Sequence, residues 1–508
     1  MKKLQKRNAL LYFIILIIGS ISLISLKPKA KKPNIVYILA DDLGYGDISI
    51  NNPEGKIPTP NIDKLAAQGM RFTDAHSPSS VCTPTRYGLL TGRYPWRSRL
   101  PIGVLKGYSR TLIENELPTV ASFLKSEGYK TGIVGKWHLG LDWYLQPTHK
   151  NLENDKLYGI SEEMNADFID FTKDPKNGPN TAGFDYSYIL PASLDMPPYC
   201  YLENQKLVER PDAYTEGNKL TSGYTGPFWR AGKMAPSFDF FKVLPTFIDK
   251  AIAFLKNQSG ERPFFLYLPL AAPHTPWVPD KAYQGKSKVG EYGDFVQQVD
   301  ASIGKILQTL KAKGLDQNTI VIVTSDNGPY WRPNFVEMFN HKAAGQFRGM
   351  KADIFEGGHR IPFIVRWPGK IKPNSISTAT TCLTNLMATC TDILSNSDTK
   401  YLSEDSYSIL PVLLGKGQKV ENQQAVVHSS SMGFYAIRKG DWKLIEGLGS
   451  GGFTEPKEIK SQNRIFGQLY NLADDIAEKN DVYSQNPDKV KELHDLLMEI
   501  KITKRKPF

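Results

Sequence analysis

The chain has 508 residues, of which 41% are hydrophobic and 23% charged, a composition typical of folded globular proteins and unlike that of disordered ones. A chain of this length predicts one large domain together with a smaller one. The formal net charge is +11, but eight basic residues and no acidic residue lie within residues 1–32, which leaves about +3 for the rest, and nucleic-acid binding is not expected because it needs basic charge on the folded domain.

The first 32 residues predict export. They begin with basic residues and continue with an apolar run from Ala9 to Leu26, which is the pattern of a secretory signal peptide. The run also approaches the length that spans a membrane, so an uncleaved N-terminal anchor is the alternative. Either interpretation exports the rest of the chain, as a periplasmic, secreted or outward-facing membrane-anchored protein.

Four apolar segments predict buried strands, and each leads into polar residues. They are residues 34–40, 130–134, 263–268 and 319–324. Helical segments lie between them, one opening at Thr59 and another that Thr119 caps and Gly128 stops. This alternation predicts an α/β fold with a large mixed, mostly parallel sheet flanked by helices, whose chemistry lies at the carboxyl ends of the strands.

The two later regions differ from this pattern. Residues 145–235 are rich in Asn, Pro, Gly and Tyr and predict long surface loops around the mouth of a site. After about residue 415, short apolar runs separated by turns predict a small antiparallel sheet, followed by a helix from about 487 to 500. The predicted organisation is a leader or anchor (1–32), a catalytic domain (33–415) and a C-terminal α+β subdomain (416–508).

Two acidic pairs follow predicted strands. Asp41-Asp42 ends the first strand, and Asp326-Asn327 ends the last. Taken singly, such residues more often form turns or helix caps. Taken together, they are oxygen ligands of the kind that Ca²⁺ and Mg²⁺ prefer.

Cys82 stands in a polar loop with the sequence C-T-P-T-R, followed shortly by L-T-G-R. A lone cysteine is usually a disulfide half or a small buried hydrophobe. If a helix starts here, Arg86 lies on the same face as Cys82, four residues on. The chain has too few cysteines for a disulfide scaffold; the other three are Cys200, Cys382 and Cys390, and spacing leaves open whether the last two pair.

Two further segments carry basic side chains and histidines. In G-K-W-H-L-G, Lys136 and His138 are two residues apart, which would direct both to one side of an extended segment. A cation with a histidine suits anion binding and proton transfer, although a snorkelling lysine or a buried histidine is the commoner interpretation of either residue alone. His274 lies between two prolines that restrict its loop.

These motifs, in this order, resemble those of the type I sulfatases, which are arylsulfatase-like, formylglycine-dependent enzymes of the alkaline phosphatase superfamily. The resemblance covers nearly all of residues 33–508 and includes a late G-M-K motif that contains Lys351. One position departs from the usual C-x-P-S-R signature, because Thr85 replaces the serine but keeps the hydroxyl group.

The resemblance implies the cofactors. Cys82 is expected to be converted to Cα-formylglycine by a formylglycine-generating or an anaerobic sulfatase-maturating enzyme. The expected metal is Ca²⁺ rather than Mg²⁺. The bound Ca²⁺ would lower the pKa of the aldehyde hydrate. Its implied ligands are Asp41, Asp42, Asp326, Asn327 and the modified Cys82.

The resemblance also implies the roles of the remaining residues. The formylglycine hydrate attacks sulfur, with Asp326 as base, and His274 or Lys351 protonates the leaving alcohol. His138 then takes the second hydroxyl proton. Positive charge from Arg86, Lys136, Lys351 and Ca²⁺ stabilises the sulfate oxygens, and Ser193 occupies the position of a hydroxyl contact to sulfate.

The expected substrate is a sulfated saccharide, with a galactose or N-acetylgalactosamine 6-sulfate suggested by overall resemblance. Aromatic and basic residues of the middle region suit a carbohydrate, since rings stack on sugars and Arg230 can pair with an acidic group. Ordinary loop packing is an equal alternative for these residues, which are Tyr199, Tyr201, Trp229 and Arg230.

Two other functions remain as alternatives. One is a phosphomonoesterase or phosphodiesterase of the same superfamily, which is disfavoured because the nucleophile position is a cysteine and the acidic motifs suit a single hard cation. The other is a non-catalytic binder of sulfated glycans, which would follow if Cys82 were never oxidised.

Overall fold

The computed structural model describes residues 31–100, 102–154, 159–160, 165–218, 228–395, 403–460 and 466–503. The predicted leader therefore lies almost entirely outside the described residues. The chain from Pro33 onward forms one compact unit. Among the described residues, no helix is both long and apolar enough to cross a bilayer.

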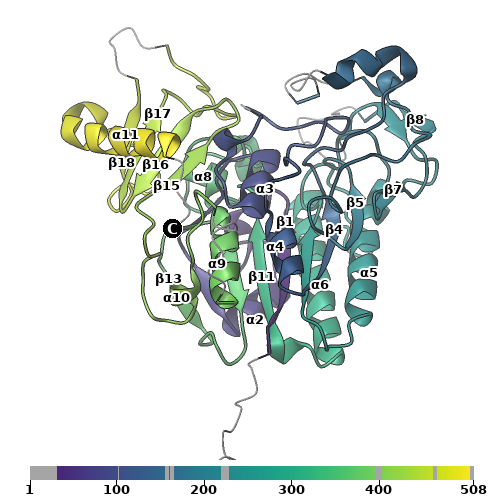
Figure 1. Cartoon of the computed structure of the whole chain (residues 1–508). Helices are drawn as coiled ribbons and strands as arrows, with labels where there is room; N and C mark the ends of the chain where they lie inside the picture. The colour runs from purple at the N-terminus through teal and green to yellow at the C-terminus, as the bar shows by residue number, and fades with distance from the viewer. Residues whose placement is uncertain are drawn as a thin grey trace, which may run out of the picture. The chain divides into compact units, whose positions relative to one another are not determined.

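A ten-stranded mixed sheet forms the centre of the fold (Figure 1). Its inner strands are parallel, and β1 pairs with β10 on one side and β11 on the other. All seven residues of β1 are buried, as expected for a strand covered on both faces. The order of strands is β13 (Ser375–Ser377), β2 (Met70–Phe72), β12 (Phe363–Arg366), β11 (Thr319–Ser325), β1 (Asn34–Ala40), β10 (Phe264–Pro269), β4 (Lys130–Lys136), β5 (Tyr186–Leu190), β6 (Leu202–Glu203) and β7 (Lys206–Leu207).

Helices flank this sheet in two groups whose members contact one another (Figure 1). One group is α2 (Pro60–Ala67), α5 (Val243–Lys256) and α6 (Gly290–Ala312); the other is α3 (Cys82–Thr91), α4 (Val120–Ser126) and α9 (Leu386–Ile393). The predicted cap is present, since the Thr119 hydroxyl accepts a hydrogen bond from the Ser122 amide at 3.0 Å. The prediction of a mostly parallel α/β sheet is thus confirmed.

The C-terminal region forms the small antiparallel sheet that its sequence predicts. The strands follow in order: β15 (Val426–Ser429), β16 (Tyr435–Lys439), β17 (Trp442–Glu446) and β18 (Gln468–Asn471). Helix α11 (Pro487–Ile502) packs against β16 and β17. The remaining elements are short: β3 (Ala75–His76), β8 (Ala213–Thr215), β9 (Gly232–Met234), β14 (Thr381–Cys382), α7 (Pro333–Phe339), α8 (Glu356–His359) and α10 (Leu410–Leu413).

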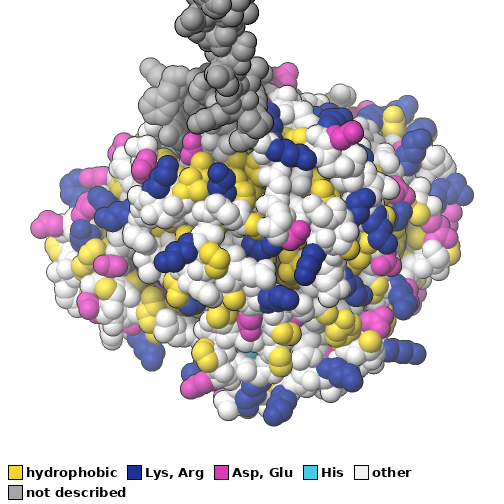
Figure 2. All heavy atoms as spheres, turned by 90° about the horizontal axis from the view of Figure 1, so that it is seen from below, with side chains coloured by type: hydrophobic (Ala, Val, Ile, Leu, Met, Phe, Trp, Pro, Cys, Tyr) yellow, Lys and Arg dark blue, Asp and Glu magenta, His cyan; other side chains and the backbone are white. Residues whose placement is uncertain are grey.

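Two further features of the described chain are the distribution of charge on its surface and the state of its cysteines. On the face shown in Figure 2, basic and acidic side chains are interspersed rather than gathered by sign, in keeping with the small net charge outside the leader. All four cysteines are buried and free, so Cys382 and Cys390 are not paired.

Candidate active site

The carboxyl ends of four neighbouring parallel strands converge on one buried polar site. Strand β1 delivers Asp41 and Asp42, and its neighbour β11 delivers Asp326 and Asn327. On the other side of β1, strand β10 leads to His274, and β4 ends at Lys136. Because parallel strands end at the same edge of a sheet, residues far apart in sequence meet here.

The two acidic pairs contact each other directly. The Asn327 side-chain amide donates a hydrogen bond to Asp42 Oδ1 at 2.7 Å, and the Asp42 backbone amide donates one to Asp326 Oδ1 at 3.2 Å. Asp42 adopts a φ of 63°, in the left-handed region, which turns the chain sharply after β1. All four side chains are buried.

A separate cation neutralises each carboxylate. Lys136 Nζ lies 2.7 Å from Asp41 Oδ2, and Lys351 Nζ lies 2.9 Å from the Asp42 carboxylate. Arg86 donates two hydrogen bonds to Asp326 Oδ2, at 2.7 and 3.0 Å. Burial alone would raise the pKa of Asp41, but the charges of Lys136, His274 and Arg86 outweigh it and hold that pKa well below its ordinary value.

Cys82 is the first residue of α3, and its Sγ lies 3.7 Å from Asp41 Oδ1. Arg86 Nη2 approaches the same oxygen at 3.6 Å, so the i, i+4 spacing does place both side chains toward one site. Burial raises the pKa of the Cys82 thiol to about 12, even though Lys136 and Lys351 act in the opposite direction. At neutral pH the group is therefore a thiol, which is a poor nucleophile.

His274 and Ser193 form one side of the site. The Ser193 hydroxyl accepts a hydrogen bond from Lys136 Nζ at 3.2 Å and lies 3.4 Å from His274 Nδ1. His274 Nε2 lies 3.7 Å from Asp42 Oδ2. The loop after β5 thus places Ser193 beside Lys136 and His274.

The backbone at His138 differs from the prediction. Strand β4 ends at Lys136 and His138 adopts a φ of 54°, so the segment is not extended as the sequence suggested. The His138 Nε2 group donates to the Leu105 carbonyl at 2.8 Å, while its buried Nδ1 has no hydrogen-bond partner among the described residues. Burial, reinforced by Lys136 and Arg86, holds its pKa well below the ordinary value, so the ring is neutral.

Arg230 lies outside this cluster and forms an ion pair with Asp195. The Arg230 side chain is 44% exposed, whereas Asp195 is buried and its Oδ1 has no partner among the described residues. The sequence analysis did not identify Asp195 as a site residue, although it lies only two residues after Ser193 in the same loop. Packing explains two of the aromatic residues, because Trp229 stacks on Phe240 with ring centroids 4.3 Å apart and Tyr199 is fully buried.

The donor set fits a hard divalent cation. Asp41, Asp42, Cys82 and His274 place ligand atoms within 4.8 Å of one another. The buried Asn327 Oδ1 has no hydrogen-bond partner among the described residues, as expected of an oxygen that serves as a metal ligand. Carboxylate and amide oxygens are the ligands that Ca²⁺ prefers.

Comparisons with known proteins agree with this geometry. The Sulfatase family model matches residues 33–396. An N-acetylgalactosamine-6-O-sulfatase from Bacteroides thetaiotaomicron is 35% identical, over 93% of this chain and 94% of that protein, and human arylsulfatase A is 32% identical over 82% and 75%. A solved structure described in connection with the metabolism of multiple glycosaminoglycans by Bacteroides thetaiotaomicron has a TM-score of 0.78 and 34% identity, over 93% of this chain and all of that one.

Proposed function

The chain belongs to the sulfatase family and is a sulfuric ester hydrolase, and we propose that it removes sulfate from a carbohydrate through a formylglycine made from Cys82. The observation that carries this proposal is the convergence of Cys82, Asp41 and Arg86, whose side chains meet within 3.7 Å at one carboxylate oxygen. The net reaction takes a sulfate ester and water to an alcohol, sulfate and a proton.

The state of Cys82 supports conversion to formylglycine. A buried thiol with a raised pKa is an inefficient nucleophile, whereas Cys82 in its hydrated aldehyde form supplies a hydroxyl oxygen that attacks sulfur. We propose that a formylglycine-generating or anaerobic sulfatase-maturating enzyme performs this oxidation, as in the resembling family.

We propose that Asp41, Asp42, Asp326 and Asn327 hold Ca²⁺, together with the modified Cys82. When bound, the cation supplies positive charge beside the sulfate and lowers the pKa of a neighbouring hydroxyl. The residues themselves supply further positive charge. Arg86 is held by Asp326 and by the Lys136 carbonyl, at 2.9 Å from its Nη1, so its orientation is fixed before substrate binds.

The lysines and histidines take the remaining roles in the proposed reaction, which are sulfate binding and proton transfer. Lys136 and Lys351 bind sulfate oxygens, with the Ser193 hydroxyl held beside them by Lys136. Asp326 is the proposed base for the attacking hydroxyl. His274 or Lys351 donates a proton to the leaving oxygen, as both lie beside Asp42 at the same edge of the site. His138 donates through Nε2 to a backbone carbonyl, which leaves a lone pair on Nδ1 to accept the second hydroxyl proton.

The proposed substrate is a saccharide with a 6-sulfate on galactose or N-acetylgalactosamine. Its main support is the 35% identical relative, whose name specifies that chemistry. The Asp195–Arg230 pair supports a carbohydrate, since a buried carboxylate oxygen without a partner and a half-exposed guanidinium can accept from and donate to sugar hydroxyl groups.

We also propose export and a two-part organisation. The basic and apolar leader (1–32) would direct export or anchor the chain, and the body would divide into a catalytic domain (33–415) and a C-terminal subdomain (416–508). The start of the antiparallel sheet at Val426 supports the second boundary. Neither alternative function is proposed, because the family model and the named relatives indicate a sulfuric ester hydrolase.

Mass spectrometry of the Cys82 peptide tests the central proposal. In active protein we expect this residue to be about 18 Da lighter than cysteine. Cys82→Ala should abolish turnover of an aryl sulfate and of N-acetylgalactosamine 6-sulfate, whereas Cys200→Ala, which removes another buried free cysteine, is the matched control and should retain activity. Turnover by Cys82→Ala, or active wild type with unmodified Cys82, would refute the mechanism.

A further inference from the structure

The segment that leads to Cys82 is bonded to the end of strand β15 in the C-terminal sheet. The Ser80 amide donates to the Ser429 carbonyl at 2.9 Å, and the Ser429 amide donates to the Pro78 carbonyl at 3.1 Å. The hydroxyl groups of Ser79 and Ser80 also donate to the Ser429 carbonyl, at 3.1 and 3.2 Å. The adjacent residue, His428, donates from Nδ1 to the Ser77 carbonyl at 3.1 Å. Strand β15 therefore fixes the backbone immediately before the proposed nucleophile.

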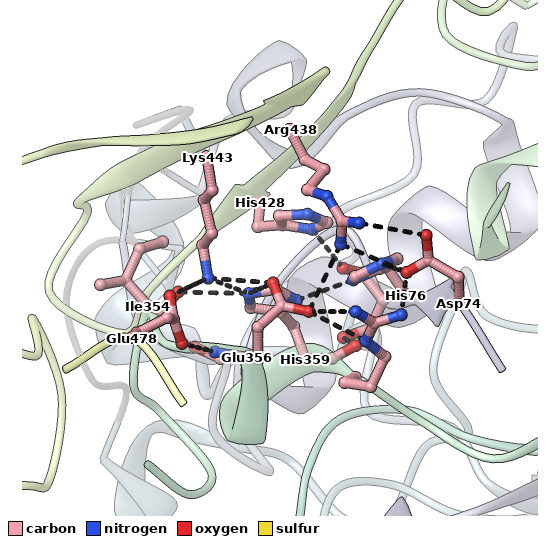
Figure 3. A network of polar contacts seen from close by, with 12 residues as sticks. Asp74, His76, Ile354, Glu356, His359, His428, Arg438, Lys443 and Glu478 are labelled. Carbon is pink, nitrogen blue, oxygen red and sulfur yellow. Dashed lines mark hydrogen bonds and ion pairs between the residues drawn. The ribbon is translucent and has the colours of Figure 1, made fainter. Parts of the chain in front are cut away.

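Three buried histidines stack behind this contact (Figure 3). His428 lies over His359 with ring centroids 3.8 Å apart and an angle of 10° between the planes. His76 lies 4.8 Å from His428 and donates or accepts through Nδ1 at 3.1 Å from His359 Nδ1. Parallel rings cannot both direct in-plane lone pairs at one ion, so His359 and His428 do not form a shared metal site.

Polar contacts hold the rings of this stack in place. Asp74 Oδ1 accepts a hydrogen bond from His76 Nε2 at 2.8 Å, and His76 Nδ1 lies 3.1 Å from His359 Nδ1. His359 Nε2 lies 3.1 Å both from Lys443 Nζ, which can only donate, and from the Ile354 carbonyl, which can only accept. Lys443 is in turn neutralised by two buried carboxylates, Glu356 at 3.1 Å and Glu478 at 2.8 Å. Burial lowers the pKa of each of the three histidines.

The stack also adjoins the other segments of the active site. Gly328, which directly follows Asn327, donates from its amide to the Gly358 carbonyl at 2.8 Å. Gly358 belongs to helix α8, which also carries His359. The Ala352 amide, directly after Lys351, donates to the Ser80 carbonyl at 2.8 Å. The histidine stack and its hydrogen bonds therefore adjoin the segments that carry Cys82, Asn327 and Lys351.

We propose that His428 is a positioning residue for catalysis: stacked on His359 and bonded to the Ser77 carbonyl, it sets the position of the segment before Cys82 relative to the acidic residues. This inference rests on the proposed role of Cys82, and sulfatase activity of the wild type provides the separate test of that role. The C-terminal sheet then acts in the reaction through backbone placement, without touching the substrate. A displacement of about 1 Å in such a segment can lower a rate by up to a hundredfold.

Two substitutions at His428 separate its hydrogen bond from its ring. His428→Phe keeps a stacking ring but removes the donor to Ser77, and His428→Asn keeps an amide donor at the position of Nδ1 but removes the ring. Turnover of an aryl sulfate is measured per formylglycine, with the content of modified Cys82 determined by mass spectrometry. His494→Asn, on α11 with a half-exposed side chain, is the control.

We expect His428→Phe to lower kcat about tenfold with KM within twofold, as for one lost hydrogen bond, and His428→Asn to restore kcat to within threefold of wild type. A purely structural role would lower the unfolding midpoint in both variants and leave kcat per formylglycine unchanged, which would overturn the proposal, as would equal losses of kcat in both. If His428→Phe does not accumulate as folded protein, the comparison of His428→Leu with His428→Asn decides, because the two side chains are alike in size and only Asn can donate to the Ser77 carbonyl. Equal kcat per formylglycine in these two variants would likewise overturn the proposal.

Discussion

The buried histidine stack predicts a specific dependence of stability on pH. In the unfolded chain, His428 binds a proton near its ordinary pKa of 6.5. In the folded chain, burial, reinforced by His76, Lys443 and Arg438, holds the pKa well below that value. The unfolded state therefore binds more protons as the pH falls, and the free energy of unfolding decreases below about pH 6.5.

The size of this effect follows from linkage. A buried histidine that stays neutral costs about 1.4 kcal/mol of stability for each pH unit below its unfolded pKa. Between pH 6.5 and pH 5, the wild type should therefore lose about 2 kcal/mol more than His428→Phe, which lacks this titrating group. The carboxylates that also titrate in this range are shared by both proteins, so their contribution cancels in the difference.

Urea unfolding followed by tryptophan fluorescence at pH 6.5 and pH 5 measures this difference. Cys390→Ala serves as the control, because burial raises the pKa of that thiol to about 12 and the substitution removes no group that titrates between pH 5 and pH 6.5; its pH dependence should match that of the wild type. The same loss of stability in the wild type and in His428→Phe would show that His428 accepts a proton in the folded state and would refute the reasoning.

Three further predictions concern the active site. His274→Ala should slow an alkyl sulfate much more than an activated aryl sulfate, because a good leaving group needs little protonation, whereas His138→Ala should slow both; equal losses on both substrates for both variants would contradict these roles. Ca²⁺ at a hundredfold excess over its Kd should stabilise the wild type by about 2.7 kcal/mol in thermal unfolding, and Asn327→Leu should lose most of that gain; an equal gain in both proteins would place the ion elsewhere. Gly328→Ala should destabilise the fold by about 1–3 kcal/mol or more, because the new Cβ would lie 1.9 Å from the Gly357 carbonyl oxygen. Gly417→Ala, whose Cβ would lie at an ordinary contact distance of 3.8 Å from the Lys419 carbonyl oxygen, should change stability by less than about 0.5 kcal/mol.

Motifs that follow strands could be placed from the sequence, because parallel strands bring their carboxyl ends to one edge. That rule was enough to bring Asp41 and Asp326 together, although they are 285 positions apart. The separate expectation of an extended segment at His138 was wrong, because a left-handed backbone conformation occurs there, after strand β4 has ended. No periodicity of the sequence indicates such a turn.

The histidine stack could not be predicted at all. His76 and His359 are 283 residues apart and lie in short elements with no strong sequence pattern. Backbone hydrogen bonds between residues 75–77 and residues 359–361 bring these two rings together, and His428 joins them from strand β15 of the C-terminal sheet. The Asp195–Arg230 pair is similar, since its two members are 35 residues apart in the sequence and neither lies in a helix or strand.

The bonds between Ser80 and Ser429 also affect the order of events during synthesis. These residues are 349 positions apart, and a ribosome that adds 5 to 20 residues per second needs roughly 17 to 70 s to make the intervening chain. Throughout that interval the segment before Cys82 lacks the strand that later fixes it. Cys82, which is only 2% exposed in the finished fold, would then still be open to the maturating enzyme proposed above. The late synthesis of β15 thus leaves an interval between the appearance of Cys82 and its enclosure.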